Sequence, residues 1–265
     1  MTTPILILGA GRMGGALIQG WDRVGAFRPD QLILRDPFPG EAAQAAAAAG
    51  ATLNPPDDQL SRARTVLLSV KPQLWREVAA GVAGLLAPDA VIVSICAGVR
   101  AGDIAAAFGG RAVGRMMPTT AVAIAQGVAS LYATDPRGAA AAHALFDPVA
   151  TTADLDDEGL IDAATAVSGS APAYVYAFVE ALEAAGARAG LPLETSQRLA
   201  RATLIGAAAL MEQSGVEPAE LRRQVTSPAG TTEAALKVLM ADDGLRPLLQ
   251  RAVDACVARA RELAG

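Results

Sequence analysis

Histidine and lysine are nearly absent from this chain of 265 residues. It contains one histidine, His143, and two lysines, Lys71 and Lys237. Most acid–base and Schiff-base mechanisms use these residue types, so the choice of catalytic chemistry is narrow. His143 lies in an alanine-rich stretch that reads as a surface helix, and nothing near it in the sequence would orient its ring for catalysis. No cysteines and histidines are grouped at metal-ligand spacing, which argues against a metal site.

Cysteine and clustered positive charge are also scarce. The two cysteines, Cys96 and Cys256, lie far apart in different kinds of segment, which fits a reducing compartment better than a disulfide framework. The net charge is −5 and no basic cluster of the kind that follows phosphates occurs, so we do not expect nucleic acid as a partner. A composition of 52% apolar and 18% charged residues is typical of a compact soluble protein.

Signal-peptide and membrane-spanning patterns are not found either. The N-terminus lacks a basic region and leads directly into residues 4–8, a length proper to a buried strand. The uncharged stretches 116–134 and 163–179 contain proline, glycine and several hydroxyl residues, so neither makes a convincing membrane span. We therefore expect a cytoplasmic protein with no membrane partner.

The first half alternates short β-rich runs with helical stretches, which indicates βαβ units and a parallel sheet. We expect strands at residues 5–8, 32–34, 65–69, 91–95, 112–116 and 128–132. We expect helices at residues 13–24, 41–49, 73–86, 101–108 and 138–146. The predicted fold class is α/β, with a Rossmann-type doubly wound parallel sheet at the N-terminus.

The second half loses the β-type alternation and reads as helix to its end. Helices are expected at residues 172–189, 194–213, 218–225, 232–240 and 246–263. Their apolar and small residues cover most of each circumference, which a lone small bundle could not bury. We therefore predict a dinucleotide-binding domain over residues 1–153, then an all-helical dimerisation and substrate domain over residues 154–265, and an obligate homodimer.

A glycine-rich turn follows the first expected strand and opens a helix, where a dinucleotide fingerprint belongs. Within it, Gly9 permits a tight turn, Gly11 lets the backbone approach a pyrophosphate, and Gly14 allows helix and strand to pack closely. Arg12 and Met13 complete this predicted cofactor site.

The end of the second expected strand decides which ribose is accepted. Asp36 could accept a hydrogen bond from the 2′-hydroxyl of NAD, whereas Arg12 and Arg35 could pair with the 2′-phosphate of NADP. Asp36 could equally cap the turn at Pro37. We favour NADP, with NAD as the alternative.

Two more segments lie at the carboxyl ends of expected parallel strands, where ligands bind in such sheets. They are residues 69–73, beginning at Ser69, and residues 94–99. Both should border the nicotinamide and its ribose. Lys71 could instead be an ordinary exposed charge, and Cys96 a packed thiol.

Thr231 and Thr232 stand where a loop containing glycine runs into a helical stretch. Free backbone N–H groups, the positive end of a helix dipole and two hydroxyls meet there, which suits a small carboxylate. The alternative is that the threonines only cap the helix.

These motifs together resemble the pyrroline-5-carboxylate reductases, the last enzymes of proline biosynthesis, and the resemblance runs from end to end. The segments that carry it are residues 9–14, 70–73, 94–99, 115–118, 168–174, 186–192 and 225–232. The family reduces pyrroline-5-carboxylate with NAD(P)H, and its all-helical C-terminal domains form interlocked dimers that in some members assemble into decamers.

The resemblance also implies roles for individual residues. It places Ser227, Thr231 and Thr232 against the pyrroline ring and its carboxyl group. It places Val70, Lys71, Pro72, Ala97 and Gly98 at the cofactor.

The sequence departs from the family at several positions. Thr119–Ala121 replaces the usual Asn-Thr-Pro, and Ala171 and Ala229 stand where glycine is common. Glu233 and Ala235 replace a usual apolar residue and glycine. A carboxylate at position 233 would repel an anion if it pointed inward. We favour an orientation in which Glu233 complements the helix dipole.

Reduction of a cyclic imine needs a hydride at C5 and a proton on nitrogen. The free pyrroline nitrogen is basic enough to be substantially protonated near neutral pH, so no strong enzymic acid is required. We expect Thr232 to hydrogen-bond the ring nitrogen and the backbone N–H groups of Gly230 to Thr232 to hold the carboxylate.

Three other functions compete with the reductase interpretation, and the first of them lacks a residue that it needs. A β-hydroxyacid dehydrogenase joins similar domains but needs an interdomain lysine, and none lies between Lys71 and Lys237. A reductase of a related cyclic imine and a non-catalytic nucleotide-sensing dimer also remain.

Overall fold

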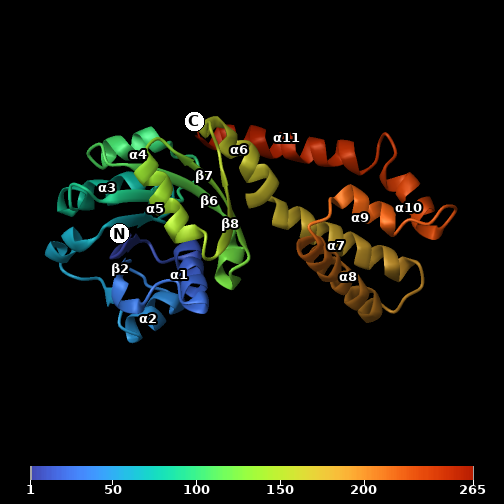
Figure 1. Cartoon of the computed structure of the whole chain (residues 1–265), viewed down its shortest axis with the longest axis horizontal. Helices are drawn as coiled ribbons and strands as arrows, with labels where there is room; N and C mark the ends of the chain where they lie inside the picture. Colours follow the sequence, from blue (N-terminus) through green and yellow to red (C-terminus); the bar gives the residue numbers. More distant parts are fainter. Residues whose placement is uncertain (1, 265) are drawn as a thin grey trace. The chain divides into compact units, whose positions relative to one another are not determined.

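The computed structural model describes residues 2–264, which divide into two compact units. One unit runs up to Gly169 and takes in the end of the chain from Val257, and the other is Ser170–Cys256. The predicted domain boundary at 153/154 stays a prediction. Figure 1 labels the elements of both units.

The first unit contains an eight-stranded sheet in the order β3-β2-β1-β4-β5-β6-β7-β8. Its strands are β1 (Ile5–Leu8), β2 (Leu32–Arg35), β3 (Thr52–Leu53), β4 (Thr65–Leu68), β5 (Val91–Ser94), β6 (Val113–Pro118), β7 (Gly127–Ala133) and β8 (Ala150–Asp154). All neighbouring strands pair in parallel except β6 and β7. The Rossmann-type fold class predicted from the sequence is confirmed.

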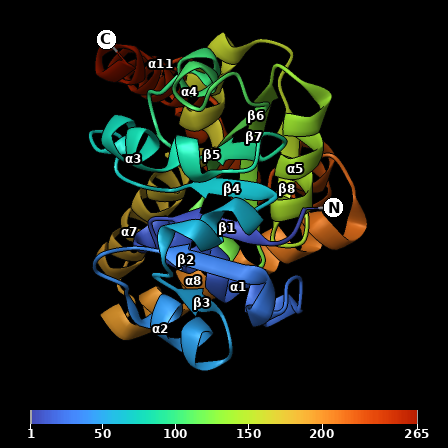
Figure 2. The same cartoon turned by 90° about the vertical axis from the view of Figure 1, so that its left-hand side faces the viewer.

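Helices cover both faces of this sheet (Figure 2). Those of the first unit are α1 (Arg12–Val24), α2 (Glu41–Ala48), α3 (Trp75–Val82), α4 (Ala101–Ala107), α5 (Pro136–Phe146) and α6 (Ile161–Ala164). Helices α1, α2 and α5 pack in one buried cluster around Trp21 and Phe146. Helices α3 and α4 pack in a second cluster around Trp75 and Phe108. The strands between them are apolar on both faces, as parallel sheets require.

The observed elements differ from the expected ones mainly at the edges. Strands β3 and β8 were not predicted. Strand β3 has only two residues, and β8 reads Ala-Thr-Thr-Ala-Asp, without the branched apolar residues that mark a strand. The helix expected at residues 73–86 begins at Trp75 and passes into a 3₁₀ turn at Ala83. Helix α5 begins two residues before the expected start, because Asp135 caps it by accepting from the N–H of Arg137 at 2.7 Å.

The second unit is helical, as the sequence predicts. Its helices are α7 (Ala171–Arg188), α8 (Leu193–Ser214), α9 (Pro218–Gln224), α10 (Thr231–Leu239) and the greater part of α11 (Leu245–Ala264). Helices α7 and α8 approach closely at Gly186, where an added Cβ would lie 2.2 Å from the Ser196 hydroxyl. That hydroxyl donates to the Glu183 carbonyl at 2.7 Å. No helix within residues 2–264 is long and apolar enough to cross a membrane.

Large apolar side chains are exposed along the whole second unit of the single chain. They include Tyr176, Phe178, Leu199, Ile205, Leu210, Met211, Val225, Val238 and Leu248. An exposed apolar surface of this extent is typical of a protein–protein interface.

Candidate functional site

The glycine-rich turn after β1 is shaped by close backbone contacts. Gly9 has φ +91°, and its N–H donates to the Arg35 carbonyl at 3.0 Å. A Cβ at Gly14 would lie 2.3 Å from the Gly9 carbonyl oxygen, so only glycine fits at this crossing. A Cβ at Gly11, in contrast, would meet nothing within 4 Å. The turn is therefore closed on the sheet side and open at Gly11.

The N-terminus of α1 lies at this opening. Gly11 is its N-cap and has no side chain to accept from the first-turn N–H groups. Arg12, Met13 and Gly14 therefore direct backbone N–H groups toward the open space, because these groups have no intrahelical partner. An open turn with free N–H groups at the positive end of a helix fits a pyrophosphate.

The Asp36 carboxylate joins the glycine-rich turn to the turn that follows β2. Its Oδ2 accepts from the N–H of Ala10 at 2.6 Å, and its Oδ1 accepts from the N–H of Phe38 at 2.7 Å. The side-chain amide of Asn54 binds the backbone of Asp36 at both its N–H and its carbonyl, at 2.9 and 2.8 Å. Of the two roles left open by the sequence, the turn-capping role is present in this structure.

The two arginines considered for a 2′-phosphate have different surroundings. Arg35 Nη1 lies 2.7 Å from Asp57 Oδ1, so its charge is already paired. The exposed side chain of Arg12 has no hydrogen bond or ion pair to any group within residues 2–264. Within the described part of the chain, Arg12 therefore presents an unpaired charge at the turn.

The carboxyl ends of β4 and β5 bring the next predicted residues together. Pro72, Ala97 and Gly98 line one pocket of about 300 Å³ with Gln73, Trp75, Arg76, Val99 and Asp103. The Ser69 hydroxyl donates to the Leu8 carbonyl at 3.1 Å and also contacts the Gly9 carbonyl. It thereby joins the β4 end to the glycine-rich turn. Val70 is half-buried and Lys71 is exposed.

Cys96 is a packed thiol, which is the alternative that the sequence offered to a place beside the nicotinamide. It is buried, and its Sγ lies 3.4 Å from the Val70 carbonyl oxygen. Burial raises the pKa of the Cys96 thiol to about 11. A thiol in that state is a poor nucleophile near neutral pH.

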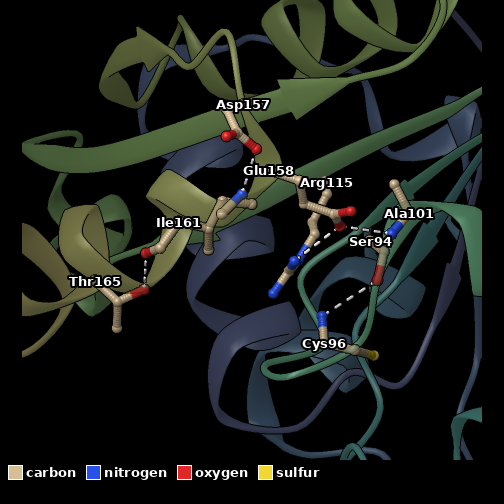
Figure 3. Close-up of polar contacts among 9 residues, drawn as sticks. Ser94, Cys96, Ala101, Arg115, Asp157, Glu158, Ile161 and Thr165 are labelled. Atoms are coloured by element: carbon tan, nitrogen blue, oxygen red, sulfur yellow. Dashed lines mark hydrogen bonds and ion pairs between the residues drawn. The ribbon is translucent and has the colours of Figure 1, made fainter. Parts of the chain in front are cut away.

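A buried ion pair that the sequence did not predict lies beside the same loops (Figure 3). Arg115 Nη1, from β6, donates to Glu158 Oε1 at 2.8 Å. The same oxygen accepts from the backbone N–H of Ala101 at 2.7 Å. A sequence signal for this pair existed, because Arg115 interrupts an apolar strand and a buried arginine needs a partner. The partner could not be identified, since Glu158 is 43 residues away.

The predicted substrate residues lie together at the start of α10. Gly230 is the N-cap, and neither Thr231 nor Thr232 caps the helix. Thr231 is exposed and Thr232 is half-buried, and neither hydroxyl has a hydrogen-bond partner in the described part of the chain. The threonines therefore do not serve the capping role that was the alternative to substrate binding.

The Ser227–Gly230 loop uses one of the N–H groups expected to hold a carboxylate. Gly230 N–H donates to the Ser227 carbonyl at 3.0 Å, which closes a turn through Ala229 at φ +57°. The free donors of the first helical turn are therefore the N–H groups of Thr231, Thr232 and Glu233. The exposed Ser227 side chain stands beside them.

Glu233 turns back over the loop. Its Oε2 accepts from the N–H of Ala229 at 2.5 Å, and its Oε1 lies 3.1 Å from Lys237 Nζ. The carboxylate thus lies at the N-terminal end of α10 and is partly neutralised by a lysine one turn on. This is the helix-complementing orientation favoured from the sequence.

The ring of His143 is held by two carboxylates, although no orienting group was expected from the sequence. Its Nδ1 lies 3.0 Å from Asp147 and its Nε2 lies 3.0 Å from Asp154. The hydrogen bond to Asp147, and less so the one to Asp154, raises the pKa of His143. The statement that nothing would orient the ring was therefore wrong, since Asp147 is one helical turn away. The contacts join α5 to the end of β8 on an exposed surface.

Comparison with known proteins finds members of one enzyme family that match this chain from end to end. The family model described as pyrroline-5-carboxylate reductase dimerisation matches residues 158–263, and that of NADP oxidoreductase, coenzyme F420-dependent, matches residues 4–98. The reductase of Pseudomonas aeruginosa is 42% identical, over 100% of this chain and 98% of that protein. The reductase of Pisum sativum is 34% identical over 97% of this chain and 94% of that protein.

The fold comparison gives the same result. The structure of a pyrroline-5-carboxylate reductase from Coxiella burnetii superposes with a TM-score of 0.92 at 29% identity, with each chain covered completely. The fold and the open turn at Gly11 thus point to the same family as the match to the dimerisation model and the full-length sequence identity. This chain belongs to the pyrroline-5-carboxylate reductase family.

Proposed function

We propose that this chain reduces 1-pyrroline-5-carboxylate to L-proline by delivering a hydride from NAD(P)H to C5 of the ring. One observation supports the part of this proposal that concerns the substrate. At the free N-terminus of α10, the hydroxyls of Thr231 and Thr232 have no partner in the described residues, and three backbone N–H groups are unpaired. Family membership makes pyrroline-5-carboxylate the first substrate to test.

The substrate carboxylate is held by the start of α10. The backbone N–H groups of Thr231 and Thr232 and the Thr231 hydroxyl are the donors, with the Ser227 hydroxyl beside them. The helix dipole favours an anion at this point. The N–H of Gly230 donates to the Ser227 carbonyl and cannot bind the substrate. Gly230 instead forms the turn that positions these donors.

The Thr232 hydroxyl accepts a hydrogen bond from the protonated ring nitrogen. The iminium carbon then gains the hydride, and the nitrogen keeps its proton, so the product is a neutral amine that takes up a second proton from water. No acid–base side chain is needed, which fits a chain with one histidine. The protein's contribution is mainly positioning, which can supply on the order of 7 kcal/mol or more.

The cofactor is held by the first unit. The N–H groups of Arg12, Met13 and Gly14 at the open turn suit its pyrophosphate, and the pocket at Pro72, Ala97 and Gly98 suits its nicotinamide end. NADP is our preferred nucleotide over NAD. The Asp36 carboxylate is already bound by two backbone N–H groups. The exposed guanidinium of Arg12, on the glycine-rich turn, has no partner within residues 2–264.

The functional unit is a homodimer formed through the second unit. The exposed apolar side chains of α7, α8 and α10 need a cover, and a second copy supplies one of matching chemistry. A monomer by sedimentation at micromolar concentration contradicts this, and a decamer is the larger assembly that the same measurement detects. Both cysteines are free, which suits the cytoplasmic location that we propose.

One assay tests the central proposal. Purified protein is mixed with NADPH or NADH, and oxidation of the nucleotide is followed on adding pyrroline-5-carboxylate. Piperideine-6-carboxylate is the control for ring size. Turnover with the six-membered ring alone identifies a related imine reductase, and nucleotide binding without turnover on either imine identifies a nucleotide-sensing dimer.

A further inference from the structure

Arg115 is buried deeply for an arginine. It lies in β6 and is 6% exposed, and its partner Glu158 is also largely buried. Figure 3 shows the guanidinium and the Glu158 carboxylate facing each other, with the Ala101 N–H on the same carboxylate oxygen. One oxygen atom therefore joins a side chain of β6 to the backbone of α4.

Ala101 is the first residue of α4, so its N–H is one of the donors that a helix leaves unpaired. Arg100, the N-cap, supplies no side-chain acceptor. Glu158 takes that place from a distant segment, at the start of the 3₁₀ turn Glu158–Leu160. The carboxylate also lies at the positive end of the α4 dipole.

The loop between β5 and α4 is thereby anchored at both ends. At its start, the Cys96 N–H donates to the Ser94 hydroxyl at 3.2 Å, and the Cys96 thiol contacts the Val70 carbonyl. At its end, Ala101 is held by Glu158. Between these anchors lie Ala97 and Gly98, which line the pocket assigned above to the nicotinamide end.

Stability alone does not account for this ion pair. Taking two charges out of water costs about as much as their attraction returns, and apolar replacements of such pairs are often neutral or stabilising. In addition, the Arg115 Nε is buried and has no hydrogen-bond partner within residues 2–264. An unpaired buried donor costs free energy, so this ion pair calls for an explanation other than stability.

We propose that Arg115 and Glu158 are positioning residues for hydride transfer. Glu158 reaches the Ala101 N–H and fixes the Ala97–Gly98 loop, and Arg115 holds Glu158 in place. The inference rests on the proposed function, because it needs this loop to carry the nicotinamide end. A displacement of about 1 Å at the reacting atoms can cost on the order of 100-fold in rate.

Two substitutions at Glu158 distinguish the effect of its side-chain length from the effect of its charge. Glu158→Asp keeps the charge but is one methylene shorter, so it cannot bind Arg115 and the Ala101 N–H together. Glu158→Gln loses the charge but keeps an oxygen that can accept both bonds. We expect kcat to fall about 100-fold in E158D. In E158Q we expect a loss of less than about tenfold.

The primary deuterium isotope effect, measured with reduced nucleotide deuterated at the transferred position, distinguishes positioning from a structural role. It should rise in E158D, because hydride transfer becomes rate-limiting, while KM for the imine stays close to the unmodified value. Arg64→Ala is the matched control. It breaks an exposed ion pair of the same 2.8 Å length, to Asp89, and should leave kcat unchanged.

The proposal is overturned by unmodified kcat in E158D, by equal losses in the two variants, or by a larger loss in E158Q. Should E158D accumulate poorly, Arg115→Met combined with Glu158→Leu replaces the charges by apolar side chains and leaves Ala101 N–H without an acceptor. That variant must also lose kcat. Turnover and nucleotide binding of the unmodified protein are measured first, so a failure of the proposed function shows there and not in the comparison.

Discussion

Asp36 Oδ2 accepts a hydrogen bond of 2.6 Å from the backbone N–H of Ala10, which ties the end of β2 to the glycine-rich turn. With Oδ1 bound to the Phe38 N–H, the carboxylate holds two backbone segments in register. An aspartate at this position of the fold is expected to bind the ribose of NAD. Here its oxygens already have backbone donors, and the neighbouring Arg12 has none of its charge paired within the described chain.

Arg12→Ala should therefore reduce the preference for NADPH. Loss of a charge-assisted hydrogen bond to the 2′-phosphate is worth about 1.5–3 kcal/mol, so KM for NADPH should rise roughly tenfold or more while KM for NADH changes little. Steady-state kinetics with both nucleotides measure this. Arg35→Ala is the matched control, because Arg35 is already paired with Asp57 at 2.7 Å. A loss confined to NADH in the Arg12 variant contradicts the assignment.

Thr232→Ala should leave the fold and the assembly unchanged and lower kcat about 100-fold, because the ring loses the hydrogen bond that positions its nitrogen and C5 for the hydride. Circular dichroism and sedimentation check the fold, and single-turnover kinetics check the chemical step. Thr151→Ala, at an exposed threonine of β8, is the control. Turnover near the unmodified rate removes Thr232 from the mechanism.

Glu233→Ala should weaken substrate binding. Glu233 holds the loop through the Ala229 N–H at 2.5 Å, and losing such a contact at a helix N-terminus costs about 1 kcal/mol. We expect a lower Tm and a higher KM for the imine. In Glu233→Gln, which keeps the acceptor but loses the charge pair with Lys237, KM should stay nearer the unmodified value. A lower KM in either variant means instead that Glu233 repels the substrate carboxylate.

His143 should make stability depend on pH. Its pKa is raised from 6.5 in the folded chain, first by the hydrogen bond to Asp147. A group with a raised folded-state pKa contributes stability below its unfolded-state pKa and loses it as pH rises through the folded-state value. Tm measured between about pH 6 and pH 8 should therefore fall more steeply in the unmodified protein than in His143→Ala. Parallel curves for the two proteins rule out this contribution.

The sequence indicated the central strands well and the edge strands poorly. Residues 5–8 were predicted without error, because a buried parallel strand is a continuous apolar run between a turn and a glycine. Strand β8 carries threonines and alanines and gains its order only from pairing with β7. Its two threonines are the only strand-favouring residues in it, and without neighbouring Val, Ile or aromatic residues they give a weak strand signal.

The site residues differ in the same way. The glycine-rich turn could be recognised because the spacing of Gly9, Gly11 and Gly14 is itself the structural requirement, and the threonines of α10 because the loop before them has a local signature. The roles of Arg35, Asp36 and Gly230 depended on partners: Asp57, the Ala10 N–H and the Ser227 carbonyl. Local patterns predict which backbone groups are presented, and tertiary contacts decide which of them remain free.

By itself, the sequence determined the fold class, the helical second half and the family, since apolar periodicity, turn residues and motif spacing are local properties of the chain. Only the tertiary structure decided that Arg115, Glu158 and Ala101 meet at one oxygen atom. Those three residues lie on different elements, and the pairing of a buried charge depends on which elements the fold brings together. The physical reason is the cost of burying an unpaired charge, which requires a partner but does not specify where in the sequence it lies.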